Sequence, residues 1–375
     1  MPERHALFLK THYNMKKFIF LAMTALSFAA CQNKNAYTIV GTIEAAGEGD
    51  SISLQLVEGR KHVDLQKAPI VNGKFEFKGI ADSVQIAAIT MNNAYCEFFL
   101  EPGEIKVDFK LGQMTTLALG TPNNNAYEAF VSDMNAIEDE YAEIAKSAQS
   151  SDLSDAKRKE IEAQLASLEE KLFQAIKNSI TDNAGNDFGL YNLCNYYNIY
   201  TPEELAVVLD SYMVAFPTNA RLQQLKKRND LTLETSVGKQ FKDFEMADVE
   251  GNMHKLSEYI AENKVTLIDF WASWCGPCRA EMPAVKAAYE AFRDKGFGIV
   301  GVSLDNNKNA WTAAIENLGM DWAHISDLKG WNCAGAKLYG VNSIPATILV
   351  AQDGTILARN IRGEAIQEKL SEILK

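Results

Sequence analysis

A largely apolar run that leads directly into a Cys-x-x-Cys pair constrains this chain more than any other feature. Val265–Trp271 is typical of a strand buried on both faces. Shortly after it comes Trp274-Cys275-Gly276-Pro277-Cys278, and a helical pattern continues from about Cys275 to Phe292. Cysteines three positions apart at the start of a helix are one turn apart. The sequence therefore predicts two neighbouring thiols at a strand–helix junction.

This placement favours redox chemistry over the other uses of such a pair. The start of a helix favours negative charge, so Cys275 is the better thiolate and nucleophile, and Cys278 can resolve a mixed disulfide. Zinc needs a second ligand pair, and only His324 and Cys333 are remotely available, in no standard spacing. Haem attachment needs a histidine directly after the second cysteine, where this chain has Arg279.

The segment around the pair alternates between strand and helix patterns. Gly298–Ser303 has the pattern of a second buried strand, and a helix is predicted over about Asn309–Leu318. A hairpin is predicted from Ala346–Val350 and Ile356–Ala358, with a last helix running to Lys375. Residues 236–375 are thus expected to form an α/β layer around a central sheet.

Several motifs in order resemble one known group of proteins. They are Asp269-Phe270-Trp271-Ala272-Ser273-Trp274-Cys275-Gly276-Pro277-Cys278-Arg279, then Glu281-Met282-Pro283, Val302-Ser303-Leu304-Asp305 and Ile344-Pro345-Ala346-Thr347. Over about residues 238–375 the chain resembles the thioredoxin superfamily, and within it the TlpA/ResA-like exported thiol–disulfide oxidoreductases, an AhpC/TSA-related branch. The resemblance implies a thioredoxin-like fold and thiol–disulfide oxidoreductase activity, without cofactor or metal.

The resemblance also implies roles for single residues. Ile344-Pro345 matches the cis-proline loop that faces the active-site disulfide, where the backbone of Ile344 pairs with an extended substrate. Asp269 matches the buried acid that takes the proton of Cys278; the alternative is a hydrogen-bonded strand acid with no proton role. Trp274, Gly276 and Pro277 are expected to form the substrate-binding surface beside the redox-active disulfide, whereas packing is the favoured role of Trp271.

Three features bear on the branch and on the direction of electron flow. The long stretch between Asp305 and Pro345 fits the insertion of the TlpA/ResA-like and peroxiredoxin branches, but the Cys-x-x-Cys pair disfavours peroxiredoxin activity. Gly276 stands where some relatives carry an acid, which leaves the direction of electron flow open. Cys333 is either a third redox thiol or, as we favour, an inert cysteine at a helix start.

Residues 1–31 have the pattern of an export signal. Lys16 and Lys17 precede the apolar run Phe18–Ala30, which is too short to span a bilayer as a stable helix. Phe28-Ala29-Ala30-Cys31 resembles a relaxed lipoprotein box, which predicts lipidation of Cys31; a plain secretory signal is the alternative. Met15 is the expected initiator.

Two further regions lie between the signal and the α/β layer. Residues 36–120 show turn signals and short apolar runs that alternate with polar positions, which predict a β-sandwich-like domain of unknown function. The runs lie within residues 37–43, 52–56, 75–77 and 105–109. Residues 121–235 have apolar side chains at helical spacing and predict a helical region. Cys96 and Cys194 lie among apolar and aromatic side chains, so buried thiols are the favoured interpretation.

Charge and cysteine usage narrow the function further. The 375 residues carry a net charge of −12, which argues against a nucleic-acid partner. Six cysteines are too few for a disulfide scaffold in a chain of this length. We expect a multidomain, lipid-anchored protein of the cell envelope, facing the periplasm. It would reduce disulfides of exported clients, one candidate pathway being cytochrome c maturation, with electrons from an envelope dithiol donor. The alternatives are a net oxidant or isomerase, and a non-catalytic adaptor lipoprotein.

Overall fold

The structure, a computed structural model, describes residues 34–43, 47, 49–59, 61–92, 94–110, 117–148 and 154–375. The predicted signal segment, Met15 and Cys31 lie outside these residues. The chain divides into two compact units, one ending at Ile199 and the other starting at Tyr200. The predicted helical region 121–235 is therefore shared between the two units, and each unit is described by itself.

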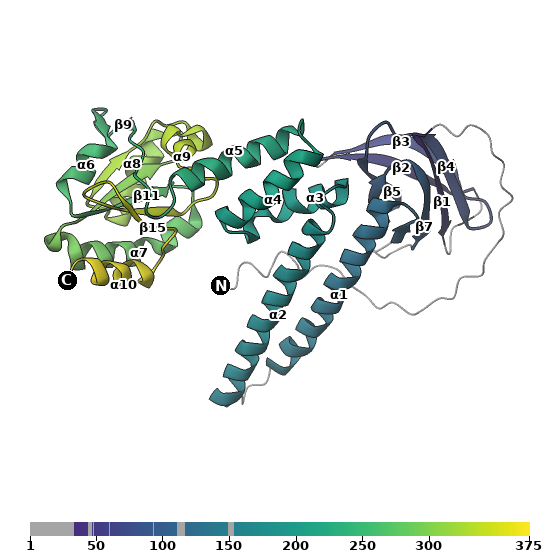
Figure 1. The fold of residues 1–375 in the computed structure, drawn as a ribbon, viewed down its shortest axis with the longest axis horizontal. Helices are drawn as coiled ribbons and strands as arrows, with labels where there is room; N and C mark the ends of the chain where they lie inside the picture. The colour runs from purple at the N-terminus through teal and green to yellow at the C-terminus, as the bar shows by residue number, and fades with distance from the viewer. Residues whose placement is uncertain are drawn as a thin grey trace. The chain divides into compact units, whose positions relative to one another are not determined.

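The first unit contains two four-stranded sheets, and Figure 1 labels strands β1 to β5 and β7 of them. The first has the order β4-β1-β7-β8 and consists of β1 (Ala36–Ile43), β4 (Lys74–Ile80), β7 (Gly103–Phe109) and β8 (Leu117–Leu119). The second has the order β3-β2-β5-β6 and consists of β2 (Ser51–Glu58), β3 (Lys61–Pro69), β5 (Gln85–Met91) and β6 (Ala94–Leu100). Strand β1 pairs antiparallel with β4 and parallel with β7.

Alternating side chains of both sheets share one hydrophobic core. Ile39, Leu54 and Phe77 are fully buried or nearly so, as are Ile105 and Phe109. A layer of inward-facing side chains between two sheets is the arrangement of a β-sandwich. The sequence expectation of an all-β region here is therefore confirmed.

Helices α1 (Pro122–Ala148), α2 (Asp155–Thr181) and α3 (Asp187–Tyr196) and the short helix Tyr197–Ile199 complete the first unit. The buried Asn124 joins α1 to β6, because its side chain accepts a hydrogen bond from the N–H of Phe99 at 2.9 Å and donates to the carbonyl of Phe99 at 2.8 Å. The amide side chain thus pairs with the backbone of β6 through one acceptor and one donor, as the backbone of a neighbouring strand does.

The second unit begins with two helices and continues with the α/β layer. Its elements are α4 (Pro202–Ala215), α5 (Ala220–Glu234), β9 (Glu245–Ala247), β10 (Met253–Lys255), α6 (Leu256–Glu262), β11 (Val265–Trp271), α7 (Gly276–Phe292), a short helix at Arg293–Lys295, β12 (Phe297–Ser303), α8 (Lys308–Leu318), β13 (Ala323–Ile325), a short helix at Gly330–Asn332, α9 (Ala334–Leu338), β14 (Ala346–Ala351), β15 (Ile356–Arg359) and α10 (Glu364–Ile373).

Five of these strands form the central sheet, in the order β13-β12-β11-β14-β15. Strands β11, β12 and β13 are parallel, whereas β14 is antiparallel to β11, and β15 to β14. Strand β11 is the middle strand and is buried at every residue, which explains its largely apolar sequence. Helices α7 and α10 lie side by side (Figure 1). The predicted thioredoxin-like fold of the C-terminal region is confirmed.

In the part of the chain that the structure describes, no helix is both long and apolar enough to cross a bilayer.

Candidate active site

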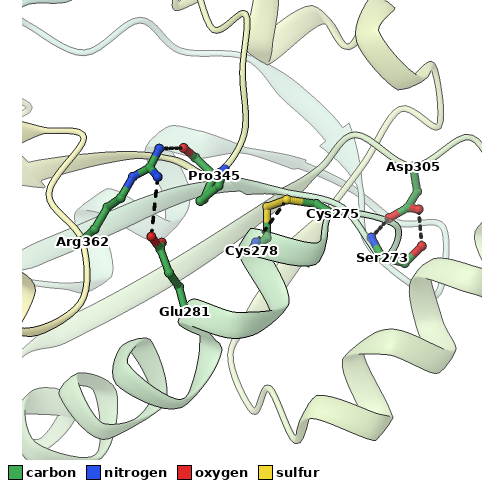
Figure 2. The surroundings of a disulfide bond; sticks show 7 residues. All are labelled: Ser273, Cys275, Cys278, Glu281, Asp305, Pro345 and Arg362. Atoms are coloured by element: carbon green, nitrogen blue, oxygen red, sulfur yellow. Dashed lines mark hydrogen bonds and ion pairs between the residues drawn. A yellow bond between two sulfur atoms is a disulfide. The ribbon is translucent and has the colours of Figure 1, made fainter. Parts of the chain in front are cut away.

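The two cysteines lie where the middle strand of the sheet passes into a helix. Cys275 is the N-cap of α7, and the N–H of Cys278 donates to its sulfur at 3.2 Å. The two residues are joined by a disulfide, with their Cα atoms 5.3 Å apart (Figure 2). A sulfur that accepts a helix N–H is one whose negative charge the helix would stabilise after reduction. Both cysteines are buried, so little of either sulfur faces solvent.

Asp269 lies on β11 and is buried. Burial raises the pKa of its carboxyl to about 7, and the negative charge of Glu281 adds to this shift, while the positive charge of Arg362 acts in the opposite direction. The charges that shift this pKa come from α7 and from the segment before α10, so the carboxyl lies near both. A carboxyl with a pKa near neutrality can take up and release a proton at physiological pH.

Arg362 joins two parts of the site that are distant in sequence. Its Nη2 donates to the carbonyl of Pro345 at 2.6 Å, and its Nη1 lies 3.6 Å from the carboxylate of Glu281 (Figure 2). Burial raises the pKa of Glu281, and Arg362 opposes that rise. One guanidinium therefore holds the Pro345 loop and the first turns of α7 together.

Ile344 and Pro345 lie directly before β14, and the peptide bond between them is cis. Figure 2 shows Pro345 beside the disulfide, on the side where Arg362 and Glu281 lie. The structure therefore brings Cys275, Cys278 and Pro345 together. Trp274, Gly276 and Pro277, the predicted substrate-binding residues around Cys275, are exposed, and so is Arg279 directly after Cys278.

A second polar group holds the segment before Cys275. The carboxylate of the buried Asp305 accepts hydrogen bonds from the N–H of Ser273 at 2.9 Å and from its hydroxyl at 2.6 Å (Figure 2). The hydroxyl of Ser303 donates to the same carboxylate at 2.8 Å. Asp305 follows β12, the strand paired with β11, so the network joins the ends of two neighbouring strands.

Sequence reasoning missed Glu281, Arg362, Ser273 and Asp305 as parts of the site. Glu281 could have been found from the sequence, because it follows Cys278 by three residues on α7 and so lies on the same face of the helix. Ser273 and Asp305 stood within recognised motifs without an assigned role. Arg362 has no local signal, since its partners are distant in sequence.

The other described cysteines lie within packed regions. Cys96, Cys194 and Cys333 are buried and are not part of a disulfide. Burial raises the pKa of Cys333 to about 11, which disfavours its thiolate and supports an inert role. His324, considered above as a zinc ligand, is buried on β13, where burial lowers its pKa to about 4. Within the described residues, no group of three or more His, Cys, Asp or Glu side chains is arranged to hold a metal ion.

Comparison with known proteins gives two family matches. Residues 237–359 match the AhpC/TSA family, and residues 37–127 match a domain of unknown function (DUF4369). Thiol-disulfide oxidoreductase ResA of Bacillus thuringiensis subsp. konkukian (strain 97-27) is 30% identical over 139 residues, which cover 37% of this chain and 77% of the relative. ResA of Geobacillus thermodenitrificans (strain NG80-2) is 28% identical over 140 residues, again 77% of the relative.

A thiol-disulfide oxidoreductase from Bacteroides fragilis NCTC 9343 is among the similar solved structures, with 34% identity, coverage of 36% of this chain and 100% of that chain, and a TM-score of 0.35. The similarity to ResA spans most of that protein, and the AhpC/TSA match over residues 237–359 includes the Cys275–Cys278 disulfide. The chain therefore belongs to the ResA-like thiol–disulfide oxidoreductases of the thioredoxin superfamily, and it carries an additional N-terminal domain.

Proposed function

We propose that this oxidoreductase reduces disulfides of exported proteins, with Cys275 as the attacking and Cys278 as the resolving cysteine. The observation that supports this most is the position of Cys275 as the N-cap of α7, where the N–H of Cys278 donates to its sulfur. The same contact stabilises the thiolate that must attack. The second cysteine follows within one turn of the helix, in reach of the first sulfur.

The proposed cycle starts from the dithiol form. The thiolate of Cys275 attacks a client disulfide, so that a mixed disulfide forms and the other client cysteine leaves as a thiolate that takes up a proton. Cys278 then gives its proton to Asp269 and attacks the sulfur of Cys275. The client's second cysteine leaves as a thiolate that takes up the proton held by Asp269, and the Cys275–Cys278 disulfide forms. Two electrons have passed to the client. An envelope dithiol donor then supplies two electrons that reduce the Cys275–Cys278 disulfide again.

In this proposal, three further residues support the exchange. The carboxylate of Asp269 is the base for Cys278, a role that suits a buried group with a pKa of about 7. Ile344 and Pro345 present the client, which pairs in extended form with the backbone of Ile344. Arg362 is a positioning residue, because it binds the Pro345 carbonyl and also counters the negative charges of Glu281 and Asp269.

The proposed place of work is the cell envelope. The basic Lys16 and Lys17, the apolar run after them and the lipobox-like Cys31 support export and a lipid anchor facing the periplasm. The clients would be exported proteins with reducible disulfides, and cytochrome c maturation is one pathway that supplies such clients.

Insulin reduction with dithiothreitol as the donor tests the proposal. The full chain should accelerate insulin precipitation, Cys275→Ser should abolish the acceleration, and Cys333→Ala, a change at a buried cysteine outside the site, should retain it. If the wild-type disulfide form oxidised a reduced client faster than the dithiol form reduced insulin, the net-oxidant alternative would replace reduction. Equal rates for wild type and Cys275→Ser would contradict both.

A further inference from the structure

Two exposed tryptophans lie side by side next to the disulfide. Trp274 directly precedes Cys275, and Trp331 lies in the short helix Gly330–Asn332, far along the sequence. Their ring centroids are 6.1 Å apart at an interplanar angle of 55°, and the residues are 53% and 48% exposed. Large aromatic side chains left half in water are typical of surfaces that bind other polypeptides.

Asp305 anchors the backbone on which each of these tryptophans stands. Its carboxylate holds the backbone and the hydroxyl of Ser273, the residue before Trp274. Its carbonyl accepts a hydrogen bond from the N–H of Gly330, the residue before Trp331, at 3.4 Å. Both tryptophans are therefore held by Asp305, at the end of β12, so little conformational freedom of their backbone has to be lost when a partner binds.

The turn that carries Trp331 is fixed on its other side as well. The carboxylate of Asp327 accepts hydrogen bonds from the N–H groups of Lys329 and Ala334, which flank the short helix. Leu328 has a φ of 53°, a strained conformation for a residue with a side chain. Directly after the helix, the fully buried Cys333 packs into the core of the second unit. These contacts present the Trp331 ring outward at a fixed position.

The ring pair is joined to the reacting cysteine through Trp274, which directly precedes Cys275 and contacts Trp331. Cys275 is only 4% exposed, so a client must come close to the residues around it before exchange can occur. The exposed residues on either side of Cys275 in the sequence are Trp274, Gly276 and Pro277. Because Trp274 is the direct neighbour of Cys275 and packs beside Trp331, a client segment bound at Cys275 comes close to this ring pair.

We propose that Trp331 extends the surface at Trp274 into a client subsite that selects disulfides flanked by an aromatic or large aliphatic side chain in an extended polypeptide. This inference rests on the proposed function and adds the substrate class. The occupant is an unfolded client segment, because only a segment without its own packed core can bring a normally buried side chain and its neighbouring cysteine to the surface together. The ring geometry of the pair suits edge and face contacts with a third apolar side chain.

The test uses the full chain in its dithiol form and three peptide disulfides of equal length and charge. The peptides carry Trp, Leu or Ser next to one cysteine. Stopped-flow detection of the released thiol, by a method that does not use tryptophan fluorescence, gives the half-saturating concentration (KM) and the limiting rate of the single turnover for each peptide. The wild-type protein should have the lowest KM for the Trp peptide and the highest for the Ser peptide, with a ratio of about three- to tenfold. Trp331→Ala should bring this ratio close to one through KM, and Trp331→Phe should restore most of it.

The control is Met253→Ala, which removes another exposed apolar side chain, on β10, and should leave the ratio as in wild type. Equal KM values for the three peptides with wild-type protein would overturn the subsite without any variant, as would an unchanged ratio in Trp331→Ala. Wild-type protein that reduces neither the peptides nor hydroxyethyl disulfide, a small disulfide that needs no subsite, would instead contradict the proposed function.

Discussion

At the scale of single residues, the buried Asp269 connects the chemistry of the site with its stability. In Asp269→Asn, the step in which Cys278 resolves the mixed disulfide should slow by about a hundredfold or more, because a general base is lost. In wild type, the rate of this step should rise with pH through about 7, where the carboxyl ionises. Stopped-flow release of a client from Cys275 measures the rate, and an unchanged pH profile in the variant would rule out the proton role.

The same substitution should change the pH dependence of folding. The folded-state pKa of Asp269 is raised, so folding favours the protonated carboxyl. The stability that this group contributes is fully present below pH about 4 and is lost as the pH rises to about 7. Asp269→Asn should therefore gain stability relative to wild type across that range, by at most about 4 kcal/mol. Urea unfolding of both proteins at pH 5 and 8 measures the difference, and a difference that does not grow with pH would contradict the burial argument.

Arg362 provides a second test of charge in the site. Arg362→Gln removes the positive charge that holds down the pKa values of Asp269 and Glu281. The pH profile of the resolution step should therefore move upward by about half to one pH unit. Arg362→Lys keeps the charge but loses the fork that binds Pro345 and Glu281, so its profile should stay near that of wild type while client KM rises. A profile in Arg362→Gln identical to wild type would show that the charge has no part.

The residues of this site differ in how well the sequence predicts them, and the difference has a physical reason. Cys275 and Cys278 are recognisable because the strand, the turn and the helix start lie next to one another in the chain. Pro345 was reached by resemblance alone, since a cis peptide bond has little local signal. Arg362 could not be found, because its partners Pro345 and Glu281 come close only after the sheet and α7 have assembled.

At the scale of elements, Arg359 attaches α5 to the central sheet within the second unit. From β15 it donates to the carbonyl of Thr235 at 2.7 Å, to the hydroxyl of the same residue, and to the carbonyl of Tyr339 at 2.9 Å. Thr235 is the C-cap of α5, so this guanidinium satisfies the end of that helix. Thr235 and Tyr339 are buried, and water cannot readily replace the donor.

Arg359→Ala should lower the free energy of unfolding by about 2–3 kcal/mol, because buried carbonyls lose a charged donor. The free energy of unfolding of Arg359→Lys should lie between those of wild type and Arg359→Ala, since an ammonium group cannot bind both carbonyls as the guanidinium does. Urea unfolding gives the values, and Arg279→Ala, at an exposed arginine on α7, is the control for loss of a charge alone. A loss no larger than that of the control would mean that the contact does not hold α5.

The strands show where patterning succeeds and fails. β1, β2, β4 and β7 alternate between buried and polar positions and were expected. β3 was missed, because almost all of its side chains are exposed and its sequence has no apolar period. β5 and β6 were missed for the opposite reason, since each contains three consecutive buried positions, Ala87–Ile89 and Phe98–Leu100, which interrupt the alternation.

At the scale of the whole molecule, the division between Ile199 and Tyr200 makes α4 and α5 part of the redox unit. We expect a fragment of residues 200–375 to unfold in one cooperative step and to retain the reactivity of Cys275. A fragment of residues 236–375 lacks Thr235 and with it two hydrogen bonds of Arg359, so it should be less stable by several kcal/mol. Equal unfolding midpoints of the two fragments in urea would show that the boundary at residue 236 is the better one.

The central claim is that Cys275 attacks client disulfides and Cys278 releases them. The most direct test is the Cys278→Ala variant of the full chain, produced in cells with its predicted signal segment, with adducts mapped by mass spectrometry after acid trapping. We predict mixed disulfides between Cys275 and exported proteins that wild type does not accumulate, and none in a Cys275→Ala variant. Absence of any adduct on Cys275 in folded, exported protein would contradict the claim, and so would equal adducts on Cys278 in Cys275→Ala.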